Sequence, residues 1–353
     1  MILKNISLQN FRSYSKKDFN FSKKTTLIVG ANTAGKSNLI EAIYFLASGG
    51  SFRIDKDEQL IKFEKEIARI KGDVGDKKLE AVIAQGGVGG RLRPFKKYLV
   101  NGVSKRKVDF VGNFFAVLFA PNDLEIIIGG PSKRRDFIDN ILIQTDREYR
   151  LALTFYEKGL RIRNALLHKA KETGRREDKE FLYWDNLLII QGQKITRKRE
   201  AFIEYLRKSR KDIFNFEIFY DKSTISSERL LQYREAEVGA GVTLVGPHRD
   251  ELEFRVLNIE HGIERSLKDF GSRGQQRLAI LQLKILELDF IEKITQNKPT
   301  LLLDDIFSEL DEGHINLVLD MIGPQQTIMT TTHEEFIPKR LLKKVNVIEL
   351  GKQ

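Results

Sequence analysis

The sequence predicts an α/β protein in which a mixed sheet surrounds a central helix, joined to a second lobe that is largely helical. Three observations predict this class. Short strand-like runs at residues 2–8 and 25–29 are followed by a glycine-rich loop and by apolar residues at helical spacing over 39–46. Residues 133–231 are highly charged, with apolar side chains at i, i+3 and i+4, which indicates helices. From residue 239 onward strand-like runs return.

The remaining elements follow in chain order. Asn101-Gly102 lies between two short runs and predicts a hairpin, because both residues tolerate the positive φ of a type I′ turn. The helical region is too short for a long coiled coil, so helices in it must fold back quickly. A helix over about 275–294 precedes the very apolar strand 300–303. These changes divide the chain into lobe I (1–125 and 295–353) and lobe II (126–294).

Composition narrows the class of protein. The 353 residues are enough for about two lobes. The 60 Lys and Arg against 49 Asp and Glu give a net charge of +11, which favours a polyanionic partner, although many soluble proteins are basic. The absence of cysteine excludes disulfides, thiolate metal sites and cysteine nucleophiles. No leader and no apolar run of about 18 residues is found, so we expect a cytoplasmic protein without a membrane partner.

The sharpest motif is a GxxxxGK[ST] phosphate loop between a strand and a helix. Backbone N–H groups and the helix N-terminus cradle phosphate oxygens, Lys36 neutralises the β and γ phosphates, and the Ser37 hydroxyl reaches Mg²⁺. The sequence therefore predicts binding of ATP with Mg²⁺ by Gly30, Ala31, Asn32, Thr33, Ala34, Gly35, Lys36 and Ser37.

The second motif is the apolar strand at 300–303, which ends in two carboxylates. Asp304 is predicted to hold Mg²⁺, and Asp305 to polarise the water that attacks the γ-phosphate. Alone, such a run is more often a core strand followed by a helix cap. Its pairing with the phosphate loop favours the catalytic interpretation.

The third motif opens a helix shortly before the acidic strand and resembles the ABC signature, whose usual form is LSGGQ. In that class the serine hydroxyl and glycine amides bind the γ-phosphate held by the opposite subunit. A serine-capped helix is the plain alternative. The order phosphate loop, signature, acidic strand is the ABC order, and it predicts an ABC-type P-loop ATPase head whose signature residues are Ser272, Arg273, Gly274 and Gln275.

Smaller segments follow where this class would have them. Residues 308–311 resemble the D-loop of the dimer seam, although a helix cap also explains Asp311. His333 follows a strand-like run, where a switch histidine would sense γ-phosphate, although a surface turn also explains it. No glutamine occupies a clear Q-loop position, and Asn122 or Asp123 could substitute.

Together these segments resemble the RecF family of bacterial DNA-repair proteins over essentially the whole chain. The most specific are GPHRD and SRGQQR, which neither transporters nor SMC proteins show in this form. The resemblance is carried by FRSY at 11–14, GANTAGKSNLIEAIYFL at 30–46, LFAPNDL at 118–124, PSKRRDFID at 131–139, VGPHRDELEF at 245–254, SRGQQR at 272–277 and LLLDDIFSELD at 301–311.

The resemblance implies an ABC-type head without a long coiled coil, an ATP-dependent homodimer and slow ATP hydrolysis. It also implies binding to double- and single-stranded DNA, including gapped or junction DNA, on the nucleoid. It implies roles in recombination, replication-fork maintenance and the SOS response, with RecR as partner and RecO and RecA downstream. Arg12 of FRSY is expected to bind nucleotide. Asp305 stands where broader patterns have glutamate, which fits slow turnover, and Arg273 replaces the first signature glycine.

Two basic segments are candidates for DNA contact. One spans the predicted hairpin and contains no acidic residue: Arg91, Arg93, Lys96, Lys97, Lys105, Arg106 and Lys107. A solvated sheet edge protected by lysines is an equally good interpretation of this segment. The other lies in the helical lobe, where charges usually face solvent: Lys194, Arg197, Lys198, Arg199, Arg207, Lys208, Arg210 and Lys211. We expect ATP-driven dimerisation to join two modest basic surfaces with little sequence specificity.

Three other classes fit less well. An SMC or Rad50-like tether needs long arms, and a transporter subunit would not carry SRGQQR or this net charge. An OLD-type nuclease needs a further acidic domain, whereas only 49 residues follow Asp304.

Overall fold

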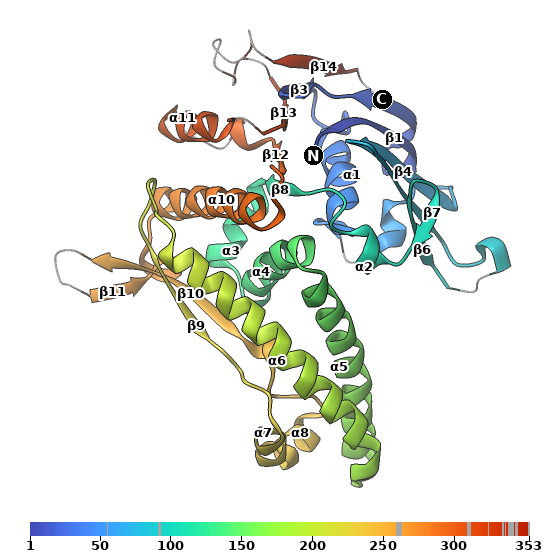
Figure 1. Ribbon diagram of the computed structural model, residues 1–353, viewed down its shortest axis with the longest axis vertical. Helices are drawn as coiled ribbons and strands as arrows, with labels where there is room; N and C mark the ends of the chain where they lie inside the picture. Colours follow the sequence, from blue (N-terminus) through green and yellow to red (C-terminus); the bar gives the residue numbers. More distant parts are fainter. Residues whose placement is uncertain are drawn as a thin grey trace. The chain divides into compact units, whose positions relative to one another are not determined.

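The computed structural model describes residues 1–54, 56–90, 93–258, 263–308, 312–323, 325–333, 335, 337, 342 and 345–351. It divides into two compact units, lobe I (residues 1–123 and 281–353) and lobe II (124–280), shown in Figure 1. The sequence placed these boundaries after residues 125 and 294. The second boundary differs because α10 (Arg273–Thr295) is one continuous helix, of which the part from Leu281 belongs to lobe I.

Lobe I contains two sheets. The first is antiparallel, with strand order β2-β1-β4-β5-β6-β7. Its hairpin between β6 and β7 turns at Asn101 and Gly102, which both have positive φ, as the sequence predicted. The strands are β1 (Leu3–Phe11), β2 (Tyr14–Asn20), β4 (Ile67–Val74), β5 (Lys77–Ala84), β6 (Phe95–Val100) and β7 (Val103–Lys105).

The second sheet is parallel, with order β14-β3-β13-β12-β8. Its central strands are fully buried and apolar or β-branched, as expected for a parallel sheet covered on both faces. The strands are β3 (Thr25–Gly30), β8 (Ala116–Phe119), β12 (Thr300–Asp304), β13 (Thr327–Thr331) and β14 (Asn346–Leu350).

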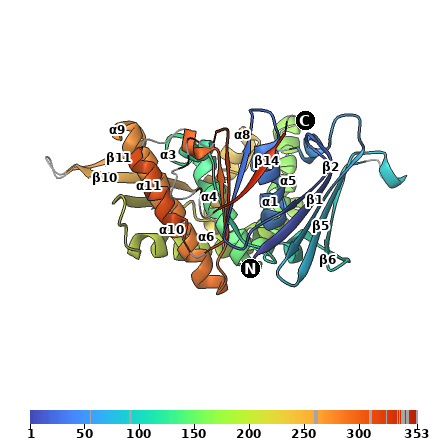
Figure 2. The same ribbon diagram turned by 90° about the horizontal axis from the view of Figure 1, so that it is seen from above.

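Helix α1 (Lys36–Ser48) lies between the two sheets and contacts strands of both (Figure 2). It is buried nearly all round, because it carries apolar residues on every face. The predicted lobe around a central helix is therefore confirmed, with its strands in two sheets. Shorter elements complete the lobe: η1 (Asp57–Leu60), η2 (Val88–Gly90), α2 (Lys107–Phe110), η3 (Pro121–Leu124), η5 (Ile306–Ser308) and α11 (Glu312–Met321).

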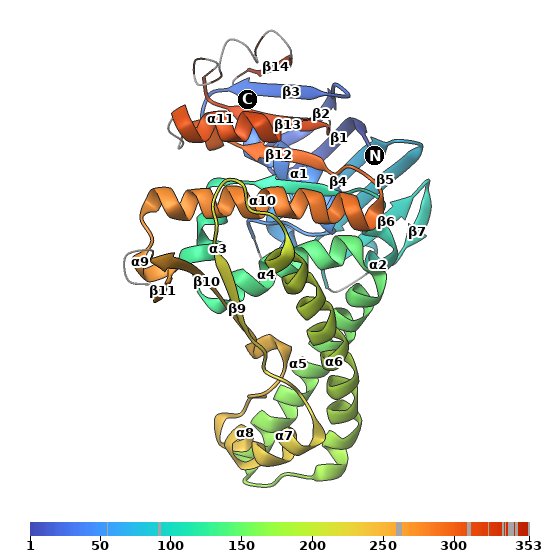
Figure 3. The same cartoon turned by 60° about the vertical axis from the view of Figure 1, so that its left-hand side comes forward.

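Lobe II is built on a hairpin of two long antiparallel helices, α5 (Arg147–Thr173) and α6 (Asp178–Lys208), seen in Figures 1 and 3. At about 1.5 Å per residue, helices of this length reach roughly 45 Å, so the described residues contain no long coiled coil, as predicted. A three-stranded sheet of β11 (Ile263–Ser266), β10 (Glu251–Asn258) and β9 (Glu217–Asp221) packs beside them. The other elements are α3 (Glu125–Ile128), α4 (Pro131–Thr145), α7 (Ser227–Gln232), α8 (Arg234–Ala240), η4 (Pro247–Arg249) and α9 (Leu267–Phe270).

The GPHRD segment, residues 246–250, is a packing element of lobe II. Gly246 has φ 124°, and a Cβ there would lie 2.2 Å from the Tyr156 hydroxyl, so only glycine fits. Asp250 accepts a hydrogen bond from Arg199 at 2.8 Å, and Arg199 also donates to Asp139. Both Arg199 and Asp250 are buried. Among the helices of the described residues, none is long and apolar enough to cross a membrane.

Candidate nucleotide-binding site

The phosphate loop runs from the end of β3 to the first turn of α1. Gly35 has φ 96°, and a Cβ there would lie 2.8 Å from the Tyr14 hydroxyl, which donates a hydrogen bond to the Gly35 carbonyl. Asn38 donates to the Ser13 hydroxyl at 3.0 Å. The FRSY segment therefore packs against the loop and fixes its shape. With no acidic residue in its first turn and no side-chain cap, the N-terminus of α1 carries a positive dipole end that favours an anion.

Lys36 lies inside this loop and is only 6% exposed. Its ammonium donates hydrogen bonds to the carbonyls of Gly30 at 2.7 Å and Ala31 at 3.1 Å. Burial lowers its pKa, whereas the nearby charges of Asp305 and Asp304 act in the opposite direction. The hydrogen-bond partners of the Lys36 ammonium are therefore neutral carbonyls. An anionic ligand can replace these carbonyls as its partner.

Ser37 and Asp304 meet although 267 positions separate them in the sequence. The Ser37 hydroxyl donates to Asp304 Oδ1 at 2.9 Å, and the Thr330 hydroxyl donates to the same oxygen at 3.0 Å. Burial raises the pKa of Asp304, and these two hydrogen bonds and the charge of Arg53 oppose the rise. A hydroxyl and a carboxylate held together are hard oxygen donors of the kind that Mg²⁺ prefers.

Asp305 occupies a rare backbone conformation, with φ 52°. Its N–H donates to the Thr330 hydroxyl at 2.9 Å. Burial raises the pKa of its carboxyl group, and Lys36 and His333 oppose this rise, so both side chains lie within electrostatic reach of Asp305. His333 itself is exposed. Strain of this kind costs on the order of 1 kcal/mol and clusters at functional positions.

Two further residues of this region were not found from the sequence. Thr330 joins Asp304 to the backbone of Asp305, and a threonine in a fully buried strand was the signal available for it. Arg53, in the loop after α1, donates to Asn38 Oδ1 at 3.2 Å and contributes to the field at Asp304. No motif marks Arg53, because its contacts are formed only by the fold.

Arg12 is held by a carboxylate. Its guanidinium donates two hydrogen bonds of 2.8 Å to Glu41, whose side chain is fully buried, and one of 3.1 Å to the Gln59 carbonyl. The side chain of Arg12 remains 19% exposed. This pair fixes the FRSY segment on α1, and the expected nucleotide contact of Arg12 stays a prediction.

The signature segment forms a reciprocal cap at the start of α10. The Ser272 hydroxyl accepts from the Gln275 N–H at 3.2 Å, and Gln275 Oε1 accepts from the Ser272 N–H at 2.9 Å. This is a capping box. Ser272, Arg273 and Gln275 are all exposed. The first turn of α10 is therefore open to solvent at these three residues and partly open at Gly274.

The Q-loop and D-loop candidates have different outcomes. Asn122 is exposed, whereas Asp123 is engaged by a hydrogen bond from the Ala120 N–H and an ion pair with Lys284 at 3.2 Å. Lys284 also pairs with Glu287 at 3.3 Å, and burial raises the pKa of Glu287 to about 7. In the segment predicted as a D-loop, Glu309, Leu310 and Asp311 lie outside the described residues.

The basic residues of the hairpin do not share one face. Lys96 forms an ion pair with Asp57, and Arg106 pairs with Asp109 at 3.0 Å. Lys97, adjacent to Lys96 on β6, is exposed on the opposite face, since successive strand residues alternate. Arg93, Lys105 and Lys107 are exposed, and Arg91 lies outside the described residues.

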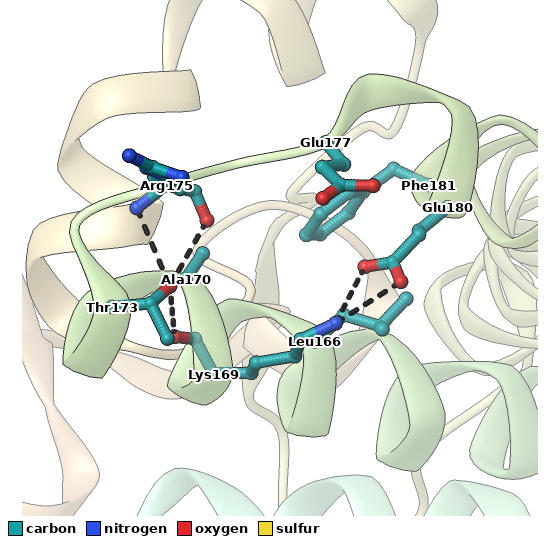
Figure 4. Close-up of a pocket in the computed structure, with 8 residues that line it drawn as sticks. All are labelled: Leu166, Lys169, Ala170, Thr173, Arg175, Glu177, Glu180 and Phe181. Atoms are coloured by element: carbon teal, nitrogen blue, oxygen red, sulfur yellow. Dashed lines mark hydrogen bonds and ion pairs between the residues drawn. The ribbon is translucent and has the colours of Figure 1, made fainter.

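Acidic neighbours engage most of the basic group in lobe II. Lys198 pairs with Asp146 at 2.7 Å, Lys194 with Glu148 and Lys208 with Glu204. A pocket of about 300 Å³ near one end of the α5–α6 hairpin is similarly mixed in charge (Figure 4). In it, Lys169 pairs with Glu180 at 3.1 Å. None of the residues predicted from sequence to bind nucleotide or DNA lines this pocket.

The fold and this site define the class as an ABC-type ATPase head. Residues 2–349 match the family model described as RecF/RecN/SMC N terminal domain. The DNA replication and repair protein RecF of Exiguobacterium sp. is 36% identical over 99% of this chain and 97% of its own. That of Moorella thermoacetica is 35% identical over 99% and 95%. The chain belongs to the RecF family.

Solved structures agree with this assignment. A structure described as the recombination mediator protein RecF with ATP in the RecFOR pathway superposes with a TM-score of 0.83, at 32% identity, over 96% of this chain and 93% of that one. The Smc head domain of Pyrococcus furiosus has a TM-score of 0.52 at 18% identity, covering 100% of this chain and 94% of that one. The second likeness shows the fold alone.

Proposed function

We propose that this protein is an ATP-driven DNA clamp of recombinational repair, in which ATP binding joins two copies and slow hydrolysis releases them. The observation that carries the proposal is the exposed capping box at Ser272. Its exposure on a helix N-terminus supports our inference that this turn binds phosphate, as in the ABC class, and that a second copy offers it to ATP held in the loop of the first.

The loop from Gly30 to Ser37 holds the triphosphate, with Lys36 exchanging its two carbonyl partners for phosphate oxygens. Ser37 and Asp304 would hold Mg²⁺, which fits because their oxygen atoms already lie 2.9 Å apart. An ion held there would neutralise part of the charge of the phosphates. Thr330 keeps the Asp304 carboxylate oriented toward Ser37.

Hydrolysis is an in-line phosphoryl transfer from ATP to water. Asp305 orients the attacking water and accepts its proton, and His333, which lies within electrostatic reach of Asp305, would sense the γ-phosphate. Because aspartate is one methylene shorter than glutamate, the water is held less well and turnover is slow. A slow step suits a switch, in which binding does the work and hydrolysis resets it.

The bound polymer is DNA, recognised through its phosphates. The net charge of +11 and the ATP-bound RecF relative of the RecFOR pathway support this assignment. The protein acts on the nucleoid in the cytoplasm, at gapped or junction DNA. There it works with RecR, and with RecO and RecA downstream, to help place RecA on single strands.

Size-exclusion chromatography with light scattering tests the proposal. We expect a monomer without nucleotide, a dimer with ATP and Mg²⁺, and co-elution of gapped DNA with the dimer only. A dimer that forms equally without ATP would contradict the proposed role of ATP binding as a switch. DNA binding that is independent of ATP would contradict the proposed ATP-driven DNA clamp, whereas the assignment as an ATPase would still hold.

A further inference from the structure

The positive charge of this protein is concentrated in one part of the chain. Residues 1–107 contain 22 Lys and Arg and 10 Asp and Glu, a net charge of +12. The other 246 residues contain 38 Lys and Arg and 39 Asp and Glu, a net charge of −1. The whole excess therefore belongs to the segment that builds the antiparallel sheet and the phosphate loop. A polyanion is attracted to that segment first.

The antiparallel sheet has one buried face and one open face. Leu8, Ile70, Ala81 and Tyr98 are aligned across four strands, and each is at most 5% exposed. The neighbouring row is shifted by one residue on every strand, so its side chains point the other way. That row runs Lys16, Gln9, Arg69, Val82 and Lys97 across β2, β1, β4, β5 and β6.

We propose that Lys16, Arg69 and Lys97, the sheet-face row, bind the phosphate backbone of DNA. The inference rests on the proposed function and assigns its contact surface. The three cations occupy every second strand, and at about 4.8 Å per strand they span roughly 19 Å. Duplex DNA carries one charge per about 1.7 Å of axis, so a row of this length meets several phosphates and needs no base contact.

The cations of this row are available to a ligand. Lys16 and Lys97 are exposed, and neither has an ion pair within the part of the chain that the structure describes. Arg69 is 41% exposed and lies 3.4 Å from Glu80. An exposed pair of this kind is worth little, so phosphate can displace the carboxylate. By contrast, Lys96 and Arg106 of the hairpin are each paired with an aspartate.

The test compares two triple variants with equal changes of charge. The sheet variant is Lys16→Gln, Arg69→Gln and Lys97→Gln. The control removes three exposed cations from α5 in lobe II, Lys158→Gln, Arg161→Gln and Lys171→Gln. Dimerisation with ATP is measured first, by light scattering, because none of these six residues belongs to the nucleotide site. DNA affinity with ATP is then measured by fluorescence anisotropy at several salt concentrations.

We expect both variants to dimerise like the parent protein and the control to bind DNA with near-parental affinity. The sheet variant should bind at least tenfold more weakly, with the slope of log affinity against log salt reduced by about 2.7 per protomer for three lost phosphate contacts. Parental affinity in the sheet variant, or an equal loss in the control, would overturn the assignment of the surface. If the parent protein itself fails to bind DNA, the proposed function fails instead.

Discussion

At the scale of single residues, Asp305 combines a catalytic assignment with a strained backbone. Its positive φ is one that aspartate and asparagine tolerate better than other non-glycine residues. Asp305→Asn should therefore keep the fold while removing the proton acceptor. We expect hydrolysis to fall by about 10²–10⁴-fold and the ATP-bound dimer to accumulate. Steady-state phosphate release and size-exclusion chromatography measure the two effects.

Asp18→Asn, at an exposed position of β2, is the matched control and should hydrolyse ATP like the parent. If Asp305→Asn does not accumulate as an ATP-bound dimer, the assignment of Asp305 as the acceptor is wrong.

We expect His248 to make the stability of lobe II depend on pH. Its Nε2 lies 3.0 Å from the Thr243 carbonyl, which can only accept, so Nε2 carries the proton and Nδ1 accepts from the Tyr156 hydroxyl at 2.8 Å. Burial lowers the pKa of His248 to about 4. Because the folded pKa lies below the unfolded value, the stabilising contribution is complete above about pH 6.5 and is lost as the pH falls toward 4.

Urea unfolding between pH 6.5 and 4.5 should show this loss, at up to about 1.4 kcal/mol per pH unit from this group. His248→Gln should flatten the profile in this window. His168→Gln, at a side chain that is 67% exposed, should keep the parental slope. A parental slope in His248→Gln would assign the acid sensitivity to other groups.

At the scale of elements, the first turn of α10 is a helix cap, and the proposed function assigns it a second, separable role as a phosphate site. Ser272→Ala removes the capping oxygen, at a cost of about 1 kcal/mol. It also removes the hydroxyl that, in the proposed function, would contact the ATP of the second copy. We expect ATP binding by the monomer to persist and ATP-driven dimerisation to weaken by at least tenfold. Nucleotide titration and analytical ultracentrifugation distinguish the two.

Ser226→Ala is a matched control, since Ser226 caps α7 by accepting from the Arg229 N–H. It should cost similar stability and leave dimerisation unchanged. Equal dimerisation in both variants would show that Ser272 acts only as a helix cap.

The sequence predicted those parts of the site that lie in short contiguous motifs. The loop from Gly30 to Ser37 and the carboxylate of Asp304 were found because strand, turn and charge are adjacent in the chain. Thr330 and Arg53 were missed because they reach the site only through tertiary contacts. The hairpin was treated as one basic face, although adjacent strand residues such as Lys96 and Lys97 must point to opposite faces.

At the scale of the whole molecule, two copies joined by ATP would present two sheet-face rows to one DNA. Six phosphate contacts predict a slope of log affinity against log salt of about −5 with ATP, and about half that without it. Affinity should differ little among unrelated sequences of equal length. Anisotropy titrations at several salt concentrations measure the slope. An affinity indifferent to salt would rule out an electrostatic clamp.

The capping box at Ser272 also has a consequence for the isolated molecule. Its two exposed helix-end groups, the Ser272 and Gln275 side chains, already bond to the backbone of this turn, so in a solitary copy both side chains have a hydrogen bond without a partner subunit. Under the proposed function, the occupancy of the Gly30 to Ser37 loop, rather than protein abundance, would then determine when pairs exist.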